Sequence, residues 1–258
     1  MANTPVEPTH VAYTDETWHN VGRYRGLGMV SVRAEDVAAL GAAVRGLLDG
    51  SGVGECKWEK VRSARTRFAA EKVVEWAIDE ARAGRLRVDV LSWDTDARSR
   101  AGTGEPHGTT LRRMYAHLLG TILPARWPGA ARWLVVPDEQ GAIPWERLRA
   151  GLSHVAGVAP GRSDAEPLIQ MADLFAGLGV YSRGGYDTYE RWLCLPPRER
   201  AAPIRLAELG MSASERERCL LLDDFYTRCI ALGLGVSLRT NRGLRTYGAD
   251  RPLCFWWA

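Results

Sequence analysis

An apolar segment in the second half of the chain, residues 168–179, places the tightest constraint on the fold. It reads Leu-Ile-Gln-Met-Ala-Asp-Leu-Phe-Ala-Gly-Leu-Gly and contains one charged residue, Asp173. A helix that is apolar on nearly all sides must be covered on nearly all sides, so this segment belongs inside a layered domain. Its small residues would allow the helix to pack closely against a sheet: Ala172, Ala176 and Gly179.

Asp173 needs a partner in that interior. An aspartate is rarely buried unless a hydrogen bond or an opposite charge compensates for its lost hydration. Two explanations are open at this point. Asp173 either forms an ion pair with a buried arginine, or it shares a site with other acids. Gln170 lies one turn earlier on the same face of the helix.

The first element predicted is a strand over His10–Thr17, in which β-branched and aromatic residues alternate with others. The strand ends in two adjacent acids, Asp15 and Glu16. Successive side chains of a strand point to opposite faces, so only one of these acids can face a given site. A second strand over residues 21–32 is expected to form a hairpin with the first through the short link 18–20.

The remaining pattern predicts an α/β protein, with a mixed sheet domain over residues 1–185 and an extension over residues 186–258 packed on the same domain. Further strands are expected at residues 85–93 and 131–136. Helices are expected at residues 34–48, 66–83, 109–123, 144–152 and 165–181, the last with Asp164 as N-cap and Pro167 in its first turn. The extension is expected to hold helices at 187–194 and 214–232, a connector at 196–211 and a hairpin about 241–243. Its final Phe-Trp-Trp, residues 255–257, either packs into the domain or forms a partner surface.

Composition excludes several classes of protein. No apolar run reaches the ~20 residues of a membrane helix. The N-terminus lacks the charged and apolar regions of a signal peptide, so we expect a cytoplasmic protein without a membrane partner. The five cysteines show no paired spacing, which favours reduced thiols over a disulfide framework or a zinc site. The net charge of +3 is weak evidence for a nucleic-acid partner.

Acids follow several of the predicted strands and turns, and these are the candidate site. Asp15 ends the first strand, Glu55 follows a glycine-rich turn, Asp138 follows the strand at 131–136, and Asp173 lies on the buried helix. Several carboxylates share a small space only when a cation offsets their repulsion. An all-oxygen set of ligands favours Mg²⁺ or Mn²⁺ over zinc. Two such ions ~3.5–4 Å apart would stabilise the attacking and leaving oxygens of a phosphodiester displacement.

Four motifs in order resemble the bacterial domain-of-unknown-function 3800 family, which is grouped with the ribonuclease H-like superfamily. They are Tyr-Thr-Asp-Glu-Thr (13–17), Glu-Cys-Lys-Trp (55–58), Val-Val-Pro-Asp (135–138) and Gln-Met-Ala-Asp-Leu-Phe-Ala-Gly (170–177), the last preceded by Ser163. The resemblance spans residues 10–181. It implies a ribonuclease H-like mixed sheet flanked by helices and an acidic, metal-dependent nuclease-type site at Asp15, Glu55, Asp138 and Asp173.

The chain departs from that family's pattern after the first strand. Thr17 and Trp18 stand where the family has Ser-Gly, so the turn there is expected to be reshaped, and residues 186–258 have no counterpart in the pattern. Lys57 is a further candidate, because only three of the 34 basic residues are lysines. On a strand, Lys57 and Glu55 would share a face, where a compact ammonium would neutralise a phosphate or a carboxylate. An ordinary surface lysine is the alternative.

Two functions from different classes are consistent with these residues. The first is a divalent-metal-dependent nuclease acting on DNA or RNA, with Asp15, Glu55, Asp138 and Asp173 as metal ligands or catalytic groups and Lys57 as an electrostatic helper. The second is a non-catalytic nucleic-acid-binding or assembly module of the same fold, part of a bacterial defence or mobile-element system, with a protein partner or a second copy of the chain. A third and weaker alternative is a nuclease toxin that is inactive until a signal arrives.

Overall fold

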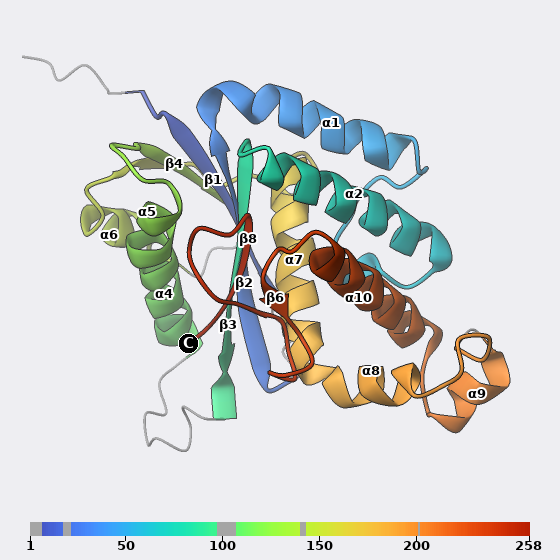
Figure 1. The fold of residues 1–258 in the computed structure, drawn as a ribbon. Coiled ribbons are helices and arrows are strands. Elements are labelled where there is room, and N and C mark those ends of the chain that lie inside the picture. The colour runs from blue at the N-terminus through green and yellow to red at the C-terminus, as the bar shows by residue number, and fades with distance from the viewer. Residues whose placement is uncertain (1–6, 18–21, 97–106, 140–142, 201) are drawn as a thin grey trace, which may run out of the picture.

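The protein is a mixed α/β structure in which a central sheet is flanked by helices on both faces (Figure 1). The computed structural model describes residues 7–17, 22–96, 107–139, 143–200 and 202–258. Within these residues the sheet has six strands, in the order β5-β4-β1-β2-β3-β8. Their bounds are β1 His10–Thr17, β2 Tyr24–Arg33, β3 Leu86–Asp94, β4 Trp133–Pro137, β5 Val155–Val158 and β8 Leu253–Trp257.

The first three strands form an antiparallel meander, and the later strands join it in parallel. β2 pairs antiparallel with β1 and with β3. β4 then pairs parallel with β1, β5 parallel with β4, and β8 parallel with β3. β1 is therefore an interior strand, and its carboxyl end lies beside the carboxyl end of β4. A separate two-stranded ladder joins β6 (Val236–Ser237) and β7 (Arg245–Thr246).

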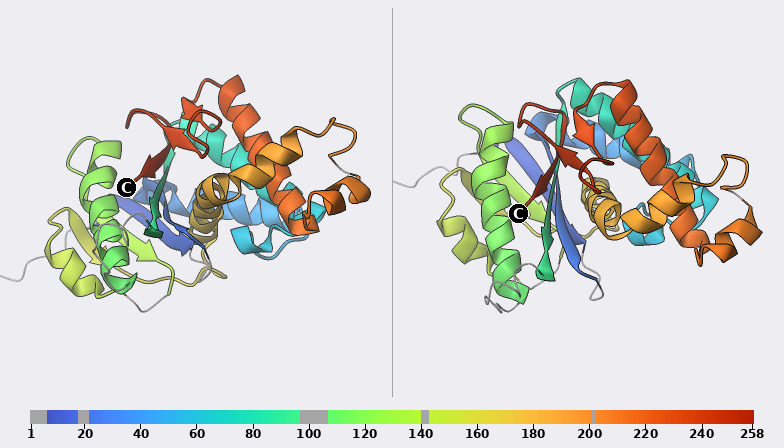
Figure 2. Two further views of the ribbon diagram at one scale, coloured as in Figure 1. Left: turned by 90° about the horizontal axis from the view of Figure 1, so that it is seen from below. Right: turned by 60° about the horizontal axis from the view of Figure 1, so that its bottom comes forward.

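Helices cover the two faces of the sheet unequally (Figure 2). One face carries the smaller layer, and its members are α4 His107–His117, the π-helical turn η3 Leu118–Ile122, α5 Leu123–Arg126 and α6 Trp145–Ala150. The other face carries the larger layer, and its members are α1 Val37–Asp49, α2 Ala64–Arg82, α7 Pro167–Gly184, α8 Tyr186–Leu193, α9 Pro203–Glu208 and α10 Ala213–Ala231. Short 3-10 turns lie at η1 Ala34–Asp36 and η2 Trp58–Lys60. Each layer encloses its own apolar core, because the strand side chains alternate between the faces.

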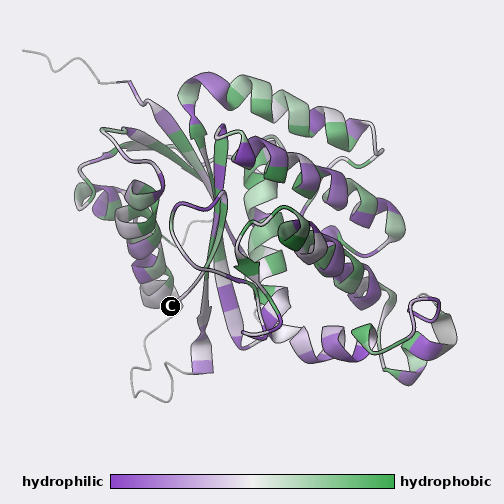
Figure 3. Ribbon diagram, viewed as in Figure 1, coloured by the Kyte–Doolittle hydropathy of each residue, from purple (hydrophilic) through white to green (hydrophobic). Residues whose placement is uncertain are grey.

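α7 is the central helix of the larger layer and is apolar along most of its length (Figure 3). It lies directly on β2, where glycines replace side chains. A Cβ atom added to Gly28 would come 2.0 Å from the Ala172 carbonyl oxygen, and one added to Gly26 would come 2.7 Å from a Val180 methyl group. The predicted close approach of this helix to the sheet is thus confirmed. Because Gly28 pairs with Asp15 across β1 and β2, the approach also brings Asp173 near the end of β1.

Residues beyond 185 are built into the same sheet. β8 extends the sheet beside β3, and its Phe255 packs against Phe225 of α10 with ring centroids 5.7 Å apart. The closing aromatic residues therefore pack into the domain. A fully buried ion pair lies beneath β8, where Arg126 Nε is 2.8 Å from Asp89 Oδ1, and the Trp256 indole N–H donates to the same oxygen.

The predicted elements agree with the structure except at a few positions. β5 was not predicted, because four residues are too few to show an alternating pattern. The predicted connector 196–211 contains α9. Asp164 was wrong as the N-cap of α7: the cap is Glu166, and Asp164 instead pairs with Arg162 at 2.6 Å. The predicted link 18–20 lies outside the described residues. Within the described part of the chain, no helix is both long enough and apolar enough to cross a membrane.

Candidate active site

Two aspartates lie side by side where β1 and β4 end. Asp15 is buried, with 3% of its side chain exposed, and points to the α7 face of the sheet. Asp138 directly follows β4, and its N–H donates to the Thr14 carbonyl oxygen of β1 at 2.9 Å. The carboxyl ends of parallel strands meet at one edge of a sheet, which is where α/β proteins commonly bind ligands.

Lys57 places its ammonium group between these two aspartates. Its Nζ atom lies 3.1 Å from Asp138 Oδ2, with a hydrogen bond, and 3.3 Å from Asp15 Oδ2. The contact with Asp15 is an ion pair without hydrogen-bond geometry, so the buried Oδ2 atom of Asp15 has no hydrogen-bond partner among the described residues. The other oxygen of Asp138 accepts from the backbone N–H groups of Glu139 at 2.9 Å and Ser163 at 3.2 Å. We call Asp15, Asp138, Asp173 and Lys57 the aspartate centre.

Two polar side chains of α7 hold the segment that carries Lys57. Asp173 Oδ2 accepts the Trp58 N–H at 2.6 Å, and Gln170 Oε1 accepts the Cys56 N–H at 2.8 Å. Gln170 also donates to the Ser163 carbonyl oxygen at 2.6 Å. Among the described residues, the partner of Asp173 is therefore a backbone amide and not a buried arginine. The two residues, spaced i and i+3 on one helix face, fix the backbone on both sides of Lys57.

The Trp58 ring rests on the helix backbone at Gly177. A Cβ atom added to Gly177 would come 2.0 Å from Trp58 Cγ and 2.2 Å from its Cβ, so no larger residue fits without moving Trp58. Gly177 follows Asp173 by one turn. α7 thus accepts a hydrogen bond from the Trp58 amide and packs against the Trp58 ring. These two contacts set the position of Lys57, the residue before Trp58.

Replacing Gly177 with Ala is expected to destabilise the protein by about 1–3 kcal/mol, because the added methyl group overlaps Trp58 and strains the Cys56–Trp58 backbone. Urea unfolding measures the effect. Gly46→Ala is the matched control, since Gly46 is an exposed residue inside α1 where an added methyl group would meet no described atom within 4 Å. There the change should stabilise by about 0.5–1 kcal/mol. Equal effects at the two positions would contradict the packing argument.

Burial and mutual repulsion govern the charges of the centre. Burial, followed by the neighbouring Asp173, raises the pKa of Asp15 to about 8 although Lys57 opposes the rise. Burial also raises the pKa of Asp173 to about 6, against the stabilising hydrogen bond from Trp58. Burial would lower the pKa of Lys57, but the attraction of Asp15 and Asp138 outweighs it and raises that pKa. The one lysine therefore does not offset the burial and mutual repulsion of the carboxylates, which favour the protonated form of Asp15 at neutral pH.

Two acids near the centre have other partners. Glu55 forms an ion pair with Lys60, and no contact within the described residues joins it to the three aspartates. Residues 55–57 form no strand, so the expectation that Glu55 and Lys57 share a strand face was wrong. Glu16 faces the opposite side of the sheet and accepts a hydrogen bond from Tyr115 at 3.1 Å. Burial raises the pKa of Glu16.

The donor atoms of the centre suit a hard divalent cation in part. Carboxylate oxygens are ligands that Mg²⁺ and Mn²⁺ prefer, and Asp15 has a buried oxygen that accepts no hydrogen bond from any described residue. In the described part of the chain, however, no three His, Cys, Asp or Glu side chains lie close enough to hold a metal together. The residues thus fit an ion bound by one or two carboxylates, Asp15 and Asp138, with water and substrate oxygens completing its shell. Such an ion would compete with the Lys57 ammonium.

Comparison with known proteins gives two archaeal relatives. The uncharacterized protein ORF2′ of Methanothermobacter thermautotrophicus is 33% identical over 267 residues, which cover 95% of this chain and 92% of the relative. The uncharacterized protein ORF2 of the same organism is 30% identical over 264 residues, with the same coverage. This chain belongs to their family. No protein-family model matches the chain. Because the matches cover nearly the whole chain, the relation to the ORF2 family includes residues that follow α7.

Proposed function

We propose that this member of the ORF2 family is a divalent-metal-dependent nuclease with a ribonuclease H-like fold. The strand arrangement supports the fold: three early strands form an antiparallel meander, and later strands separated by helices add in parallel beside β1. The motif resemblance to the domain-of-unknown-function 3800 family supports the same assignment, since Asp15, Lys57, Asp138 and Asp173 all come from those motifs.

The convergence of the aspartate centre is the observation that carries the proposal. Asp15 and Asp138, at the carboxyl ends of two parallel strands, both contact Lys57, and Asp173 binds the backbone amide of the residue that follows Lys57. The burial and mutual repulsion of these aspartates raise the pKa of Asp15 to about 8, and strongly perturbed groups of this kind cluster at functional sites.

The residues of the centre have distinct roles in this proposal. Asp15 and Asp138 would hold Mg²⁺ or Mn²⁺, which in such sites activates water and neutralises charge on a phosphate. Lys57 would donate to a non-bridging phosphate oxygen, for which a compact ammonium is suited. Asp173 acts through the Trp58 amide and fixes the direction of Lys57. Glu55, paired with Lys60, has no direct role in this arrangement.

Cleavage assays test the proposal. The purified protein, incubated with labelled DNA, RNA or an RNA–DNA hybrid, is expected to cut at least one of them in Mg²⁺ or Mn²⁺, because the carboxylates need a cation to bind the phosphate. Excess EDTA should stop the reaction, and restoring the metal should restart it. Cleavage that continues in EDTA, or no cleavage of any of these substrates with either metal, would remove the support for a metal-dependent nuclease.

One observation favours the non-catalytic alternative. The Lys57 ammonium contacts Asp15 and Asp138 together, so it already supplies a positive charge between them. A protein of this kind would bind a nucleic acid without cutting it. Calorimetry with Mg²⁺ and Mn²⁺ separates the two functions: heat of binding that disappears in Asp15→Asn agrees with the nuclease, whereas no binding alongside retained nucleic-acid affinity agrees with the binding module.

A further inference from the structure

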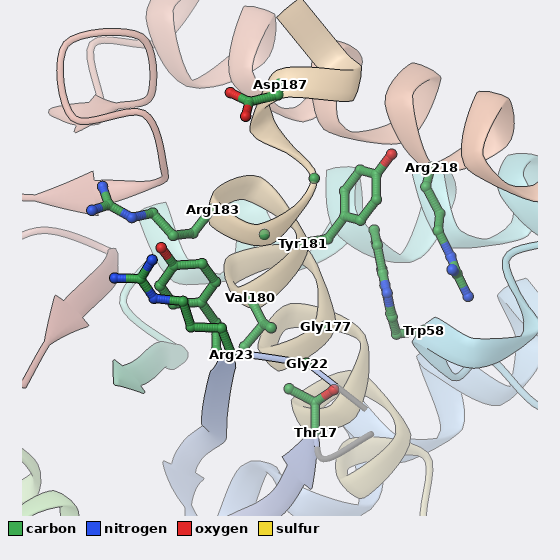
Figure 4. A pocket seen from close by; sticks show the side chains of 13 residues that line it. Thr17, Gly22, Arg23, Trp58, Gly177, Val180, Tyr181, Arg183, Asp187 and Arg218 are labelled. Atoms are coloured by element: carbon green, nitrogen blue, oxygen red, sulfur yellow. The ribbon is translucent and has the colours of Figure 1, made fainter. Parts of the chain in front are cut away.

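A pocket of about 500 Å³ lies over the last turns of α7 (Figure 4). The elements that build the centre also line this pocket. On β1, Thr17 stands two residues beyond Asp15 and points to the same face. On α7, Gly177 follows Asp173 by one turn. The Trp58 ring lines the pocket while its amide binds Asp173.

These shared elements fix the spacing of the two sites. Two residues along a strand span ~6.6 Å, and four residues along a helix span ~6 Å. The pocket therefore begins close to the aspartate centre and extends away from it along α7. A nucleic-acid strand with its scissile phosphate at the aspartates would place a neighbouring nucleotide in the pocket.

The pocket has an excess of positive charge. Arg218 of α10 forms no hydrogen bond or ion pair with any described residue, and its Nε atom is buried without a partner there. Among the described residues, Arg183 donates only to the Asn241 carbonyl oxygen, which leaves its charge uncompensated. In Figure 4 these two guanidinium groups lie on either side of α7. Neither arginine forms an ion pair with a described carboxylate, although Glu215 and Glu59 lie near enough to Arg218 to attract its charge, so an anion would find donors here.

The other charged residues of the pocket are already paired. Arg23 forms a salt bridge with Asp94 at 2.6 Å. Asp187, the one acid that lines the pocket in the described part of the chain, is paired with Arg242, which lies outside the lining. The free charges that face the cavity are therefore cationic.

Aromatic rings flank the guanidinium groups of Arg218 and Arg183. The Arg218 guanidinium lies 5.4 Å from the Trp58 ring centroid, and Arg183 lies 5.7 Å from that of Tyr24. Stacking on a ring orients the planar guanidinium and leaves its N–H groups available as donors. This combination of arginine and aromatic walls is typical of grooves that follow a nucleic-acid backbone.

We propose that this pocket binds the nucleic-acid backbone beyond the scissile phosphate, with Arg218 and Arg183, on either side of α7, each contacting a different phosphate. The inference rests on the proposed nuclease function, because that function places the substrate at the aspartate centre. The inference also gives the direction of the bound nucleic-acid strand, which runs from the aspartate centre along the last turns of α7 toward α8.

Equilibrium binding in EDTA tests the pocket separately from cleavage. A fluorescent single-stranded oligonucleotide is titrated with the wild type, Arg218→Gln and Arg183→Gln. Each variant is expected to bind about tenfold more weakly, because a charge-assisted phosphate contact is lost. The slope of log affinity against log salt should fall by about 0.7 for each contact removed. Arg218→Lys should restore the slope, since it keeps the charge.

Arg198→Gln is the matched control, because Arg198 is exposed, lies outside the pocket lining and changes the net charge equally. Unchanged affinity and salt slope in both pocket variants would overturn the proposal even if the protein cuts nucleic acid. Reduced affinity in a protein that does not cut would keep the pocket and remove the nuclease. Competition by a mononucleotide or inorganic phosphate as strongly as by the oligonucleotide would make this a small-anion site and would also overturn the proposal.

Discussion

Asp15→Asn is expected to lower nuclease activity by roughly 10³-fold or more while leaving the fold intact. The amide keeps the shape of the side chain but removes the negative charge that would hold the metal, and a metal contributes several kcal/mol to transition-state stabilisation. The variant and the wild type are compared in the same Mg²⁺ or Mn²⁺ assay. Asp79→Asn is the control, because Asp79 is an exposed aspartate of α2 that is paired with Arg82 and forms no contact with the centre in the described structure, and it should leave activity unchanged.

The stability of Asp15→Asn separates loss of charge from loss of fold. The pKa of Asp15 is raised from 3.8 to about 8, so in the folded protein burial and repulsion outweigh the attraction to Lys57. Ionisation of Asp15 therefore destabilises the fold progressively as pH rises between these two values. The asparagine variant should match the wild type in stability below about pH 4 and exceed it increasingly up to about pH 8. Urea unfolding at several pH values measures the difference.

Two results would count against this account of Asp15. An active Asp15→Asn enzyme would show that the residue holds no metal. A variant that is less stable than the wild type at pH 8 would show that the Lys57 contact, and not repulsion, dominates at this position. If the variant is inactive and at least as stable as the wild type, the loss of activity is due to the missing charge and not to unfolding. Such a result is common for functional residues, because proteins often retain destabilising groups that their function needs.

Arg126→Met is expected to be the most destabilising single substitution considered for this fold, at about 3–5 kcal/mol, because it leaves Asp89 charged and buried without its cation. Both side chains are completely buried. Arg126 of α5 also donates to the carbonyl oxygens of Ala249 and Pro252, so it connects α5 to the segment that precedes β8. The melting temperature should fall by roughly 6 to 20 °C.

A double substitution distinguishes a lost ion pair from a lost packing contact. Asp89→Asn combined with Arg126→Met removes both charges and keeps an acceptor for the Trp256 indole N–H. It should recover most of the stability that Arg126→Met loses, since replacing a whole buried pair is far less destabilising than breaking it. Arg205→Met, at an exposed pair with Glu208, should change stability by less than about 1 kcal/mol. A double variant as unstable as Arg126→Met would mean that the ionic pairing is not the cause.

Much of the site was predictable because it depends on strand ends and one helix. Asp15 and Asp138 end neighbouring strands, and the isolated acid in the apolar helix marked Asp173. The rarity of lysine marked Lys57. Glu55 could not be separated from them by sequence, because only the three-dimensional structure shows it turned toward Lys60. The i and i+3 spacing of Gln170 and Asp173 was visible, but their hydrogen bonds to the Cys56–Trp58 backbone were not.

The parts that sequence did not predict depend on contacts between distant segments. The arginines of the pocket, Arg183 and Arg218, come from α7 and α10 and look like any others in a chain rich in arginine. The pairing of β8 with β3 joins segments separated by most of the chain, and no local pattern records it. β5 is too short for its alternation to be detected.

The position of β8 has a consequence for synthesis. Until residues 253–257 have left the ribosome, β3 is an open sheet edge and Asp89 lacks the Trp256 hydrogen bond. An exposed edge strand recruits other chains. The nascent polypeptide is therefore prone to aggregate until β8 has joined the sheet, and fragments that stop before residue 253 should require a chaperone to remain dispersed.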